Sequence, residues 1–240
     1  MLDQPIPAKV MMQVRDLNAW YGESHVLHGI NLDLKEGEVI TLLGRNGAGK
    51  TTTLRSIMGM LGKRTGSVRV LDQEVINRNA RHIARMGVGY VPEERGIYAS
   101  LTVRENLHLP PKVRPGGFTD EQVFELFPNL KDRINSQGTK LSGGEQQMLA
   151  LGRILRTGAR LLLCDELTEG LAPVIIQQIG HTLHRLRAQG FTIILVESNF
   201  RFTQGIADRH YILEQGRVVD EVPNHALEAS LPRLNRYLGV

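Results

Sequence analysis

A glycine-rich string near the start of the chain has the residue types and spacing of a phosphate-binding loop. It follows the apolar run Val39 to Leu43, precedes a segment of helical character from Lys50 to Met60, and reads Gly44-Arg45-Asn46-Gly47-Ala48-Gly49-Lys50-Thr51. Glycines let backbone N–H groups turn toward phosphate oxygens, and the start of the next helix is electropositive. The string therefore predicts a loop that binds the phosphates of a nucleoside triphosphate.

Three side chains at the end of this loop have separate expected tasks. Lys50 is placed to reach the β- and γ-phosphates, the Thr51 hydroxyl to ligate Mg²⁺, and Thr52 to add a phosphate hydrogen bond. A chance match to a short motif is the alternative. The strand before the loop and the helix after it are, however, the context that the mechanism requires.

An acidic pair, Asp165-Glu166, follows the apolar run Arg160 to Cys164. The carboxyl ends of strands are where open α/β sheets bind ligands. We expect Asp165 to hold Mg²⁺, directly or through water, and Glu166 to orient and polarise the attacking water, because phosphoryl transfer needs an aligned nucleophile. The alternative is a solvated strand end without function.

A second glycine-containing string, Leu141-Ser142-Gly143-Gly144-Glu145-Gln146-Gln147, stands before a helix-compatible run from Glu145 to Leu155. Such a helix start exposes free N–H groups and a hydroxyl to an anion. Since the chain already has a phosphate loop, this string would serve a nucleotide held by another subunit. On the alternative interpretation Ser142 only caps the helix and the glycines only form a turn.

The fold expected around these motifs is an α/β core. Apolar segments rich in Val, Ile and Leu alternate with helical segments, as in βαβ units around a buried parallel sheet. Gln215-Gly216 predicts a hairpin turn, and Met12 to Leu34 has the short alternating runs of a small antiparallel layer. The further expected strands are Gly87 to Val91, Arg160 to Cys164, Thr192 to Val196, Tyr211 to Leu213 and Arg217 to Glu221.

Helical signals replace strand signals between Glu93 and about Gly158. Thr102 with Glu105, and Thr119 with Gln122, have the spacing of helix capping boxes. We therefore expect a helical subdomain, about 93–158, inserted in the α/β core. A longer helix is expected from Pro173 to about Gln189, with Gly190 as its cap.

Composition limits the kinds of partner. The 240 residues carry a formal net charge of +4 without a basic run, so we expect no nucleic-acid partner. Met1 to Val10 lacks the features of a secretory signal. The apolar runs are shorter than the ~20 residues of a membrane helix. The single cysteine, Cys164, cannot form an internal disulfide. His181 and His184 lack an acidic or cysteine companion at matching spacing, so a surface helix face is favoured over a metal site.

Taken together, these strings resemble an ABC transporter ATP-binding subunit over nearly the full length. The resemblance implies one domain over 1–240: a P-loop NTPase with a mainly parallel core sheet, an N-terminal antiparallel β layer and the inserted helical subdomain. It implies ATP and Mg²⁺ as ligands, and two subunits meeting head to tail so that Ser142, Gly143, Gly144 and Glu145 of one close over the ATP of the other. Tyr21 is the candidate for stacking on adenine, with core packing as the alternative.

Finer strings resemble the branched-chain amino acid importer branch, LivF-type. Glu93 stands where most ABC ATPases have a glutamine, and Gly170-Leu171-Ala172-Pro173 lacks the usual aspartate. The resemblance implies that Glu93 starts a coupling loop. The alternative role for Glu93 is a contact with Mg²⁺ through water. Two departures from the branch are Leu167, in place of proline, and Ser198, where a longer side chain is expected to contact the γ-phosphate. We expect hydrolysis to survive at a reduced rate.

The implied function is ATP hydrolysis that powers a multi-subunit importer, peripheral on the cytoplasmic face of the inner membrane. The implied partners are a second ATPase subunit, either a copy or, as the resemblance favours, a paralogue, together with membrane permeases and, indirectly, an extracytoplasmic solute-binding protein. Urea, amides and aromatic acids remain alternative solutes. A soluble non-transport ABC ATPase, or an ATP-binding regulatory subunit with weak hydrolysis, remains the alternative of another class.

Overall fold

A six-stranded sheet forms the centre of the computed structural model, which describes residues 9–238. Its strand order is β10-β9-β3-β8-β7-β6, with β9 and the four strands after it parallel and β10 antiparallel to β9. Residues 1–8 and 239–240 lie outside the described residues. They include both ends of the single domain expected over 1–240 and most of Met1 to Val10, the segment expected to lack a secretory signal. The strands are β3 (Val39–Leu43), β6 (Val88–Val91), β7 (Leu161–Asp165), β8 (Thr192–Val196), β9 (Arg209–Glu214) and β10 (Arg217–Pro223).

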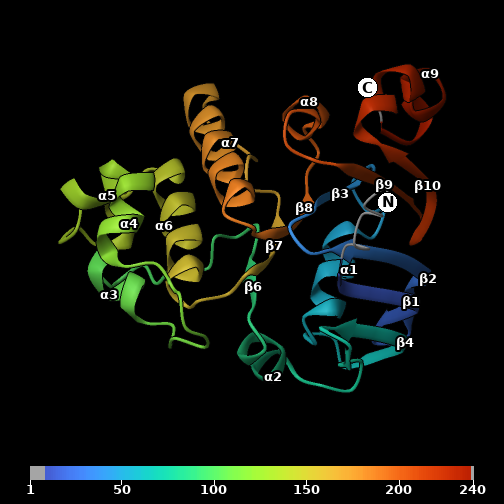
Figure 1. Cartoon of the computed structure of the whole chain (residues 1–240), viewed down its shortest axis with the longest axis horizontal. Coiled ribbons are helices and arrows are strands. Elements are labelled where there is room, and N and C mark those ends of the chain that lie inside the picture. The colour runs from blue at the N-terminus through green and yellow to red at the C-terminus, as the bar shows by residue number, and fades with distance from the viewer. Residues whose placement is uncertain (1–8, 239–240) are drawn as a thin grey trace, which may run out of the picture.

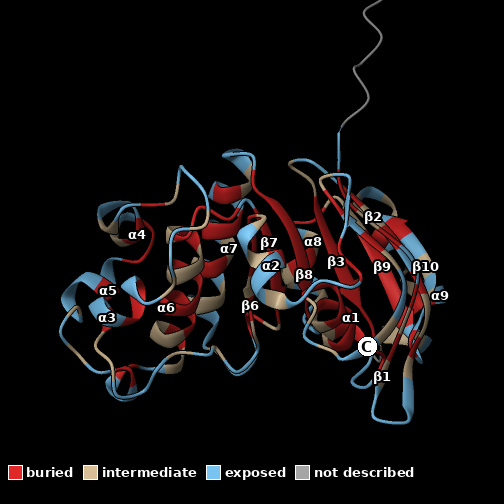
Figure 2. Ribbon diagram, turned by 90° about the horizontal axis from the view of Figure 1, so that it is seen from below, coloured by how far each residue is buried: buried red, intermediate tan, exposed pale blue. Residues whose placement is uncertain are grey.

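The expected parallel core is confirmed, and its strands are buried on both faces. Every residue of β3, β7 and β8 is buried, as Figure 2 shows in red. Because side chains alternate along a strand, Leu161 and Leu163 pack in one core cluster while Leu162 and Cys164 pack in the other. Cys164 is thus a small core residue, and burial raises the pKa of its thiol.

An antiparallel sheet, β2-β1-β4-β5, covers one face of the central sheet. The expectation of short strands over Met12 to Leu34 was wrong, because β1 (Val10–Tyr21) and β2 (Ser24–Lys35) are 12 residues each and pair through several bulges. Bulges interrupt the strict alternation, so a long irregular strand resembles several short ones in sequence. The layer also contains β4 (Lys63–Val70) and β5 (Gln73–Glu74), two strands that were not predicted from the sequence.

Helices cover the other face and one end of the molecule. Figure 1 shows α3, α4, α5 and α6 gathered at the end opposite β1, β2 and β4, with α7 beside them. α1 packs between the two sheets, and α9 lies against β9 and β10. The helices are α1 (Lys50–Ile57), α2 (Ala80–Arg85), α3 (Val103–His108), α4 (Asp120–Leu126), α5 (Pro128–Asp132), η1 (Gly138–Lys140), α6 (Gly143–Arg156), α7 (Pro173–Ala188), α8 (Phe200–Gln204), η2 (Asn224–Ala226) and α9 (Leu227–Leu238).

Both expected capping boxes open helices in this region. Thr102 accepts a hydrogen bond from the Glu105 amide at the start of α3, and Thr119 accepts one from the Gln122 amide at the start of α4. In each case the side chain of the third helical residue accepts in return from the cap amide. Within residues 9–238, none of the helices is both long and apolar enough to cross a bilayer.

Candidate functional site

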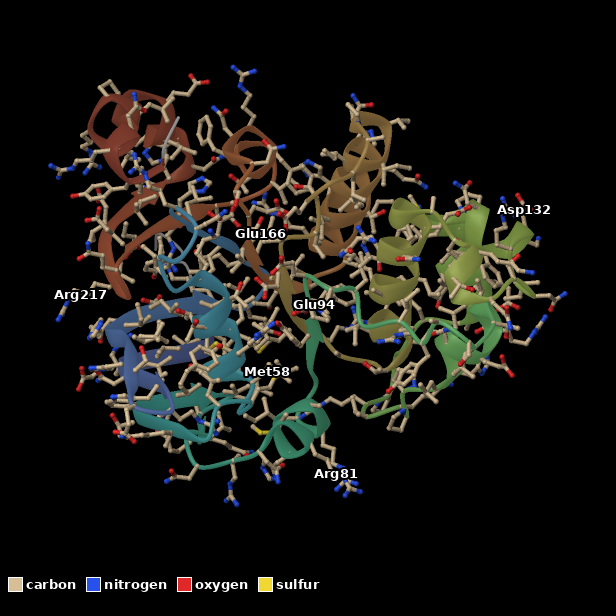
Figure 3. All side chains as sticks on the ribbon, turned by 180° about the vertical axis from the view of Figure 1, so that it is seen from behind. Met58, Arg81, Glu94, Asp132, Glu166 and Arg217 are labelled. Atoms are coloured by element: carbon tan, nitrogen blue, oxygen red, sulfur yellow. The ribbon has the colours of Figure 1, made fainter. Side chains whose placement is uncertain are left out.

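The phosphate loop borders a cavity of about 540 Å³ beyond the carboxyl ends of β3, β7 and β8. Residues 46–52 form one side of it, and Glu93, Glu166 and Ser198 contribute from other segments. In Figure 3 Glu166 lies near the middle of the molecule, between the helical end that holds Asp132 and the opposite side, which holds Arg217. The parallel strands therefore bring together most of the residues that the sequence singled out.

Lys50 is fixed by the backbone of its own loop. Its Nζ donates to the Gly44 carbonyl at 2.9 Å and lies 3.5 Å from Glu166 Oε1, and the side chain is 5% exposed. A Cβ at Gly44 would come within 2.3 Å of the Leu213 carbonyl oxygen, whereas one at Gly47 would meet no atom within 4 Å. Gly44 is thus required by packing, and Gly47 leaves its backbone open for a ligand.

Thr51 and Tyr90 hold the buried carboxylate of Asp165. The Thr51 hydroxyl donates to Oδ1 at 2.9 Å and the Tyr90 hydroxyl donates to Oδ2 at 3.0 Å. Burial raises the pKa of Asp165 above its ordinary value, although these two hydrogen bonds oppose the shift. A hydroxyl beside a carboxylate is an oxygen donor set that fits Mg²⁺, which neutralises phosphate charge when bound.

The Glu166 carboxylate is held by Ser198. The Ser198 hydroxyl donates to Oε1 at 2.7 Å and its backbone N–H donates to Oε2 at 3.0 Å. Glu166 has a positive φ of 47°, a conformation that a non-glycine residue keeps only where its surroundings enforce it. The Ser198 hydroxyl, expected to face the γ-phosphate, is therefore engaged with the carboxylate that is expected to orient water.

Glu93 lines the same cavity from the loop after β6. Burial, together with the nearby charge of Glu169, raises the pKa of Glu93 above its ordinary value. Its neighbour Glu94 accepts from the Arg55 guanidinium at 2.8 Å, so this loop is tied to α1. Glu93 is thus near the expected magnesium position without a contact that assigns it there.

The second glycine-containing string lies outside this cavity. Ser142 accepts from the Glu145 amide at 3.3 Å, and Glu145 Oε2 accepts from the Ser142 amide at 2.8 Å, so the two form a capping box at the start of α6. A Cβ at Gly144 would come within 2.8 Å of Ile175 on α7, and one at Gly143 within 3.2 Å of the Arg95 guanidinium. The glycines therefore permit close packing as well as an exposed helix start.

Tyr21 does not belong to the described lining of the cavity either. It ends β1, and its residue is 43% exposed, which argues against the alternative of core packing. Val26, on the neighbouring strand β2, lines the cavity instead. The structure of the single chain thus brings neither Tyr21 nor Ser142 to Lys50.

Tyr90, Thr168 and Glu197 are residues of the site that the sequence did not predict. Thr168 and Glu197 line the cavity, and Tyr90 binds Asp165. Glu197 directly follows the predicted strand Thr192 to Val196. Asp165 and Glu166 were predicted because ligands of open α/β sheets bind at the carboxyl ends of strands, and the same reasoning would have predicted Glu197. Tyr90 lies within a strand, and no local pattern marks its hydroxyl.

The model of the family described as ABC transporter matches residues 27–169. The chain belongs to the ABC transporter family. It is 40% identical over 237 residues to the high-affinity branched-chain amino acid transport ATP-binding protein BraG of Pseudomonas aeruginosa, covering 95% of this chain and 100% of that protein. It is 32% identical to a probable LivF protein of the same transport class from Archaeoglobus fulgidus, covering 87% of this chain and 90% of that one.

Solved structures agree on the fold. A nucleotide-free ATP-binding cassette from an ABC transporter superposes with a TM-score of 0.81 at 22% identity, covering 93% of this chain and 95% of that structure. A dimeric bacterial ABC transporter cassette gives a TM-score of 0.78 at 25% identity, covering 89% of this chain and 99% of that one. The expected ABC nucleotide-binding fold is therefore confirmed.

Proposed function

We propose that this chain is the ATP-binding and hydrolysing subunit of a multi-subunit importer for branched-chain amino acids. The observation that carries hydrolysis is the placement of Glu166 in the phosphate cavity, 3.5 Å from Lys50 and bound by Ser198. The solute class is carried by the 40% identity to BraG across its full length. Related transporters of urea, amides or aromatic acids are the alternatives that an uptake measurement must separate.

The chemistry proposed for the site follows from its contacts. Backbone amides of residues 44–49 and the Lys50 ammonium would hold the phosphates, Thr52 would add a hydrogen bond, and Thr51 with Asp165 would hold Mg²⁺, which supplies positive charge when bound. Glu166 would orient the attacking water. Because Ser198 donates two hydrogen bonds to Glu166, that carboxylate keeps one orientation and needs little rearrangement during the reaction.

A second ATPase subunit would complete each site. The start of α6, with Ser142, Gly143, Gly144 and Glu145, lies outside this chain's cavity and has free N–H groups for an anion. We propose that it closes over the ATP of a partner ATPase, a paralogue rather than a copy, and that Tyr21 stacks on adenine. The pair would act on membrane permeases at the cytoplasmic face of the membrane, with a solute-binding protein on the other side and Glu93 at the start of the coupling loop.

Reconstitution tests this function directly. The chain is co-expressed with candidate permease, ATPase and solute-binding subunits, and the complex is placed in vesicles and supplied with ATP and radiolabelled leucine. We expect ATP-dependent leucine uptake that Glu166→Gln lowers by about 100-fold while nucleotide binding persists. If the vesicles take up urea or an aromatic acid and not leucine, the proposed solute class is wrong and one of these alternatives replaces it. Failure to co-purify with any permease would contradict the importer and favour a soluble ABC ATPase.

A further inference from the structure

Glu197 is a buried carboxylate in the nucleotide cavity, and the proposed hydrolysis assigns it no task. It follows β8 directly, is 1% exposed, and lines the cavity beside Ser198. Both of its oxygens accept hydrogen bonds from one residue: the Thr168 backbone N–H donates to Oε1 at 3.1 Å and the Thr168 hydroxyl donates to Oε2 at 2.6 Å. Its bonds therefore run to the loop after β7, the loop that carries Glu166.

A second pair of hydrogen bonds joins the same two loops, with the donor on the loop after β8 and the acceptor on the loop after β7. Ser198 donates its backbone N–H and its hydroxyl to Glu166, just as Thr168 donates both groups to Glu197. Each loop thus provides one carboxylate and one hydroxyl residue, and each carboxylate receives two bonds from the other loop. Two hydrogen bonds from one neighbouring residue fix the orientation of each carboxyl group. We call these four residues the reciprocal clamp.

The parallel pairing of β7 and β8 explains why the clamp forms. Asp165 pairs with Val196, so the residues that follow each strand emerge side by side at the same edge of the sheet. The Glu166 amide also donates to the Val196 carbonyl at 2.9 Å. Glu166 has a positive φ at this point, and the two bonds from Ser198 hold its side chain.

We propose that Glu197 is a positioning residue for Glu166, holding Thr168 so that the loop after β7 keeps the Glu166 carboxylate beside Lys50. Its effect on turnover rests on the ATP hydrolysis proposed above, whereas the bonding between the two loops does not. Burial, opposed by the bonds from Thr168, raises the pKa of Glu197 to about 8. Glutamine keeps a carbonyl oxygen that can accept from the Thr168 backbone N–H and offers an N–H to the Thr168 hydroxyl, so it should replace Glu197 well.

Turnover of the reconstituted complex separates positioning from charge. We expect Glu197→Ala to lower kcat at least tenfold while the Kd for a fluorescent ATP analogue stays within threefold, and Glu197→Gln to stay within threefold of the native kcat. Thr168→Val should lower kcat and Thr168→Ser should restore it. Thr182→Val is the matched control, because Thr182 is a buried threonine of α7 whose hydroxyl donates within its own helix. Glu197→Gln as slow as Glu197→Ala, or a native rate in Thr168→Val, would overturn the proposal.

Hydrogen exchange tests the clamp without hydrolysis. In the full-length chain, exchange of the amides of residues 166–169 and 197–199 is followed by mass spectrometry. We expect Glu197→Ala to speed exchange at least tenfold in both segments and Glu197→Gln to change it less than threefold. Unchanged exchange in Glu197→Ala overturns the clamp even if the complex hydrolyses ATP. Absence of hydrolysis by the native complex overturns the proposed function instead, and exchange still decides the clamp.

Discussion

Thr51 and Asp165 lie 114 residues apart in the sequence, yet the Thr51 hydroxyl donates a 2.9 Å hydrogen bond to Asp165 Oδ1. Thr51 is the second residue of α1, and Asp165 ends β7. The bond joins the end of the phosphate loop to the acidic pair. Oxygen donors held in place in this way favour a cation that accepts little distortion of its coordination, as Mg²⁺ does.

Removing this oxygen pair should abolish the dependence on Mg²⁺. For Asp165→Asn and Thr51→Val we expect kcat/KM for ATP to fall by at least about 100-fold, because the charge that neutralises the phosphates is no longer held. A titration of ATPase rate against Mg²⁺ concentration measures it. Ser56→Ala is the control, since its hydroxyl donates within α1 to the Thr52 carbonyl. A native Mg²⁺ response in Asp165→Asn would contradict the assignment.

Gly47 should matter for binding rather than packing. Gly47 and Gly37 both have positive φ, 81° and 75°, and at neither would a Cβ meet an atom within 4 Å. We expect Gly47→Ala and Gly37→Ala to lose similar stability, about 1–2 kcal/mol, from backbone strain. Gly47→Ala alone should weaken ATP binding, by about tenfold or more, because its methyl enters the cavity. Equal ATP affinities in calorimetric titrations of the two variants would refute this.

Ser198 should influence turnover through Glu166. Ser198→Ala keeps the backbone donor and loses the hydroxyl donor at 2.7 Å, so we expect kcat to fall by about three- to tenfold. Ser198→Gln and Ser198→His are expected to raise turnover, because a longer side chain can reach the γ-phosphate. Steady-state ATPase rates decide. If neither Ser198→Gln nor Ser198→His raises turnover, the short side chain of Ser198 does not limit the rate of hydrolysis. Slow hydrolysis by the native chain would then favour a regulatory subunit.

Glu197 should make stability depend on pH. Its pKa of about 8 in the folded chain exceeds the ordinary 4.5, so between these values the native state holds a proton that the unfolded state has released. The free energy of unfolding therefore falls as pH rises through this window, with a slope of at most about 1.4 kcal/mol per pH unit. Glu197→Gln should remove the slope. Urea titrations at pH 5, 6.5 and 8 compare the two chains, and parallel pH profiles would disprove the shift.

Ser142 should have two separable effects. As the cap of α6 it contributes about 1 kcal/mol, so Ser142→Ala should lower the unfolding free energy by that amount. Thr119→Ala, which removes the equivalent cap of α4, should match this loss without changing turnover. We expect Ser142→Ala to slow hydrolysis at the site that holds the partner's phosphate loop. If Ser142→Ala and Thr119→Ala have equal turnover in the assembled complex, Ser142 serves only as the N-cap of α6.

Much of the site could be predicted from sequence because its motifs are local. The glycines of residues 44–49 need particular backbone conformations within a few residues, and Asp165-Glu166 follows an uninterrupted apolar strand. Capping boxes are likewise spaced within one helical turn, which is why Thr102 and Thr119 were identified. The antiparallel layer was less predictable, since bulges in β1 and β2 disturb the alternation on which such predictions depend.

Sequence alone thus determined the phosphate loop, the acidic pair, the second helix start and the α/β class, since each depends on contacts between near neighbours in the chain. Tertiary structure decided which of them meet. The order of parallel strands placed β7 beside β8, and so joined Glu166 to Ser198 and Thr168 to Glu197. The same packing kept Ser142 away from Lys50. Strand order is set by long-range burial of both sheet faces, which no short segment encodes.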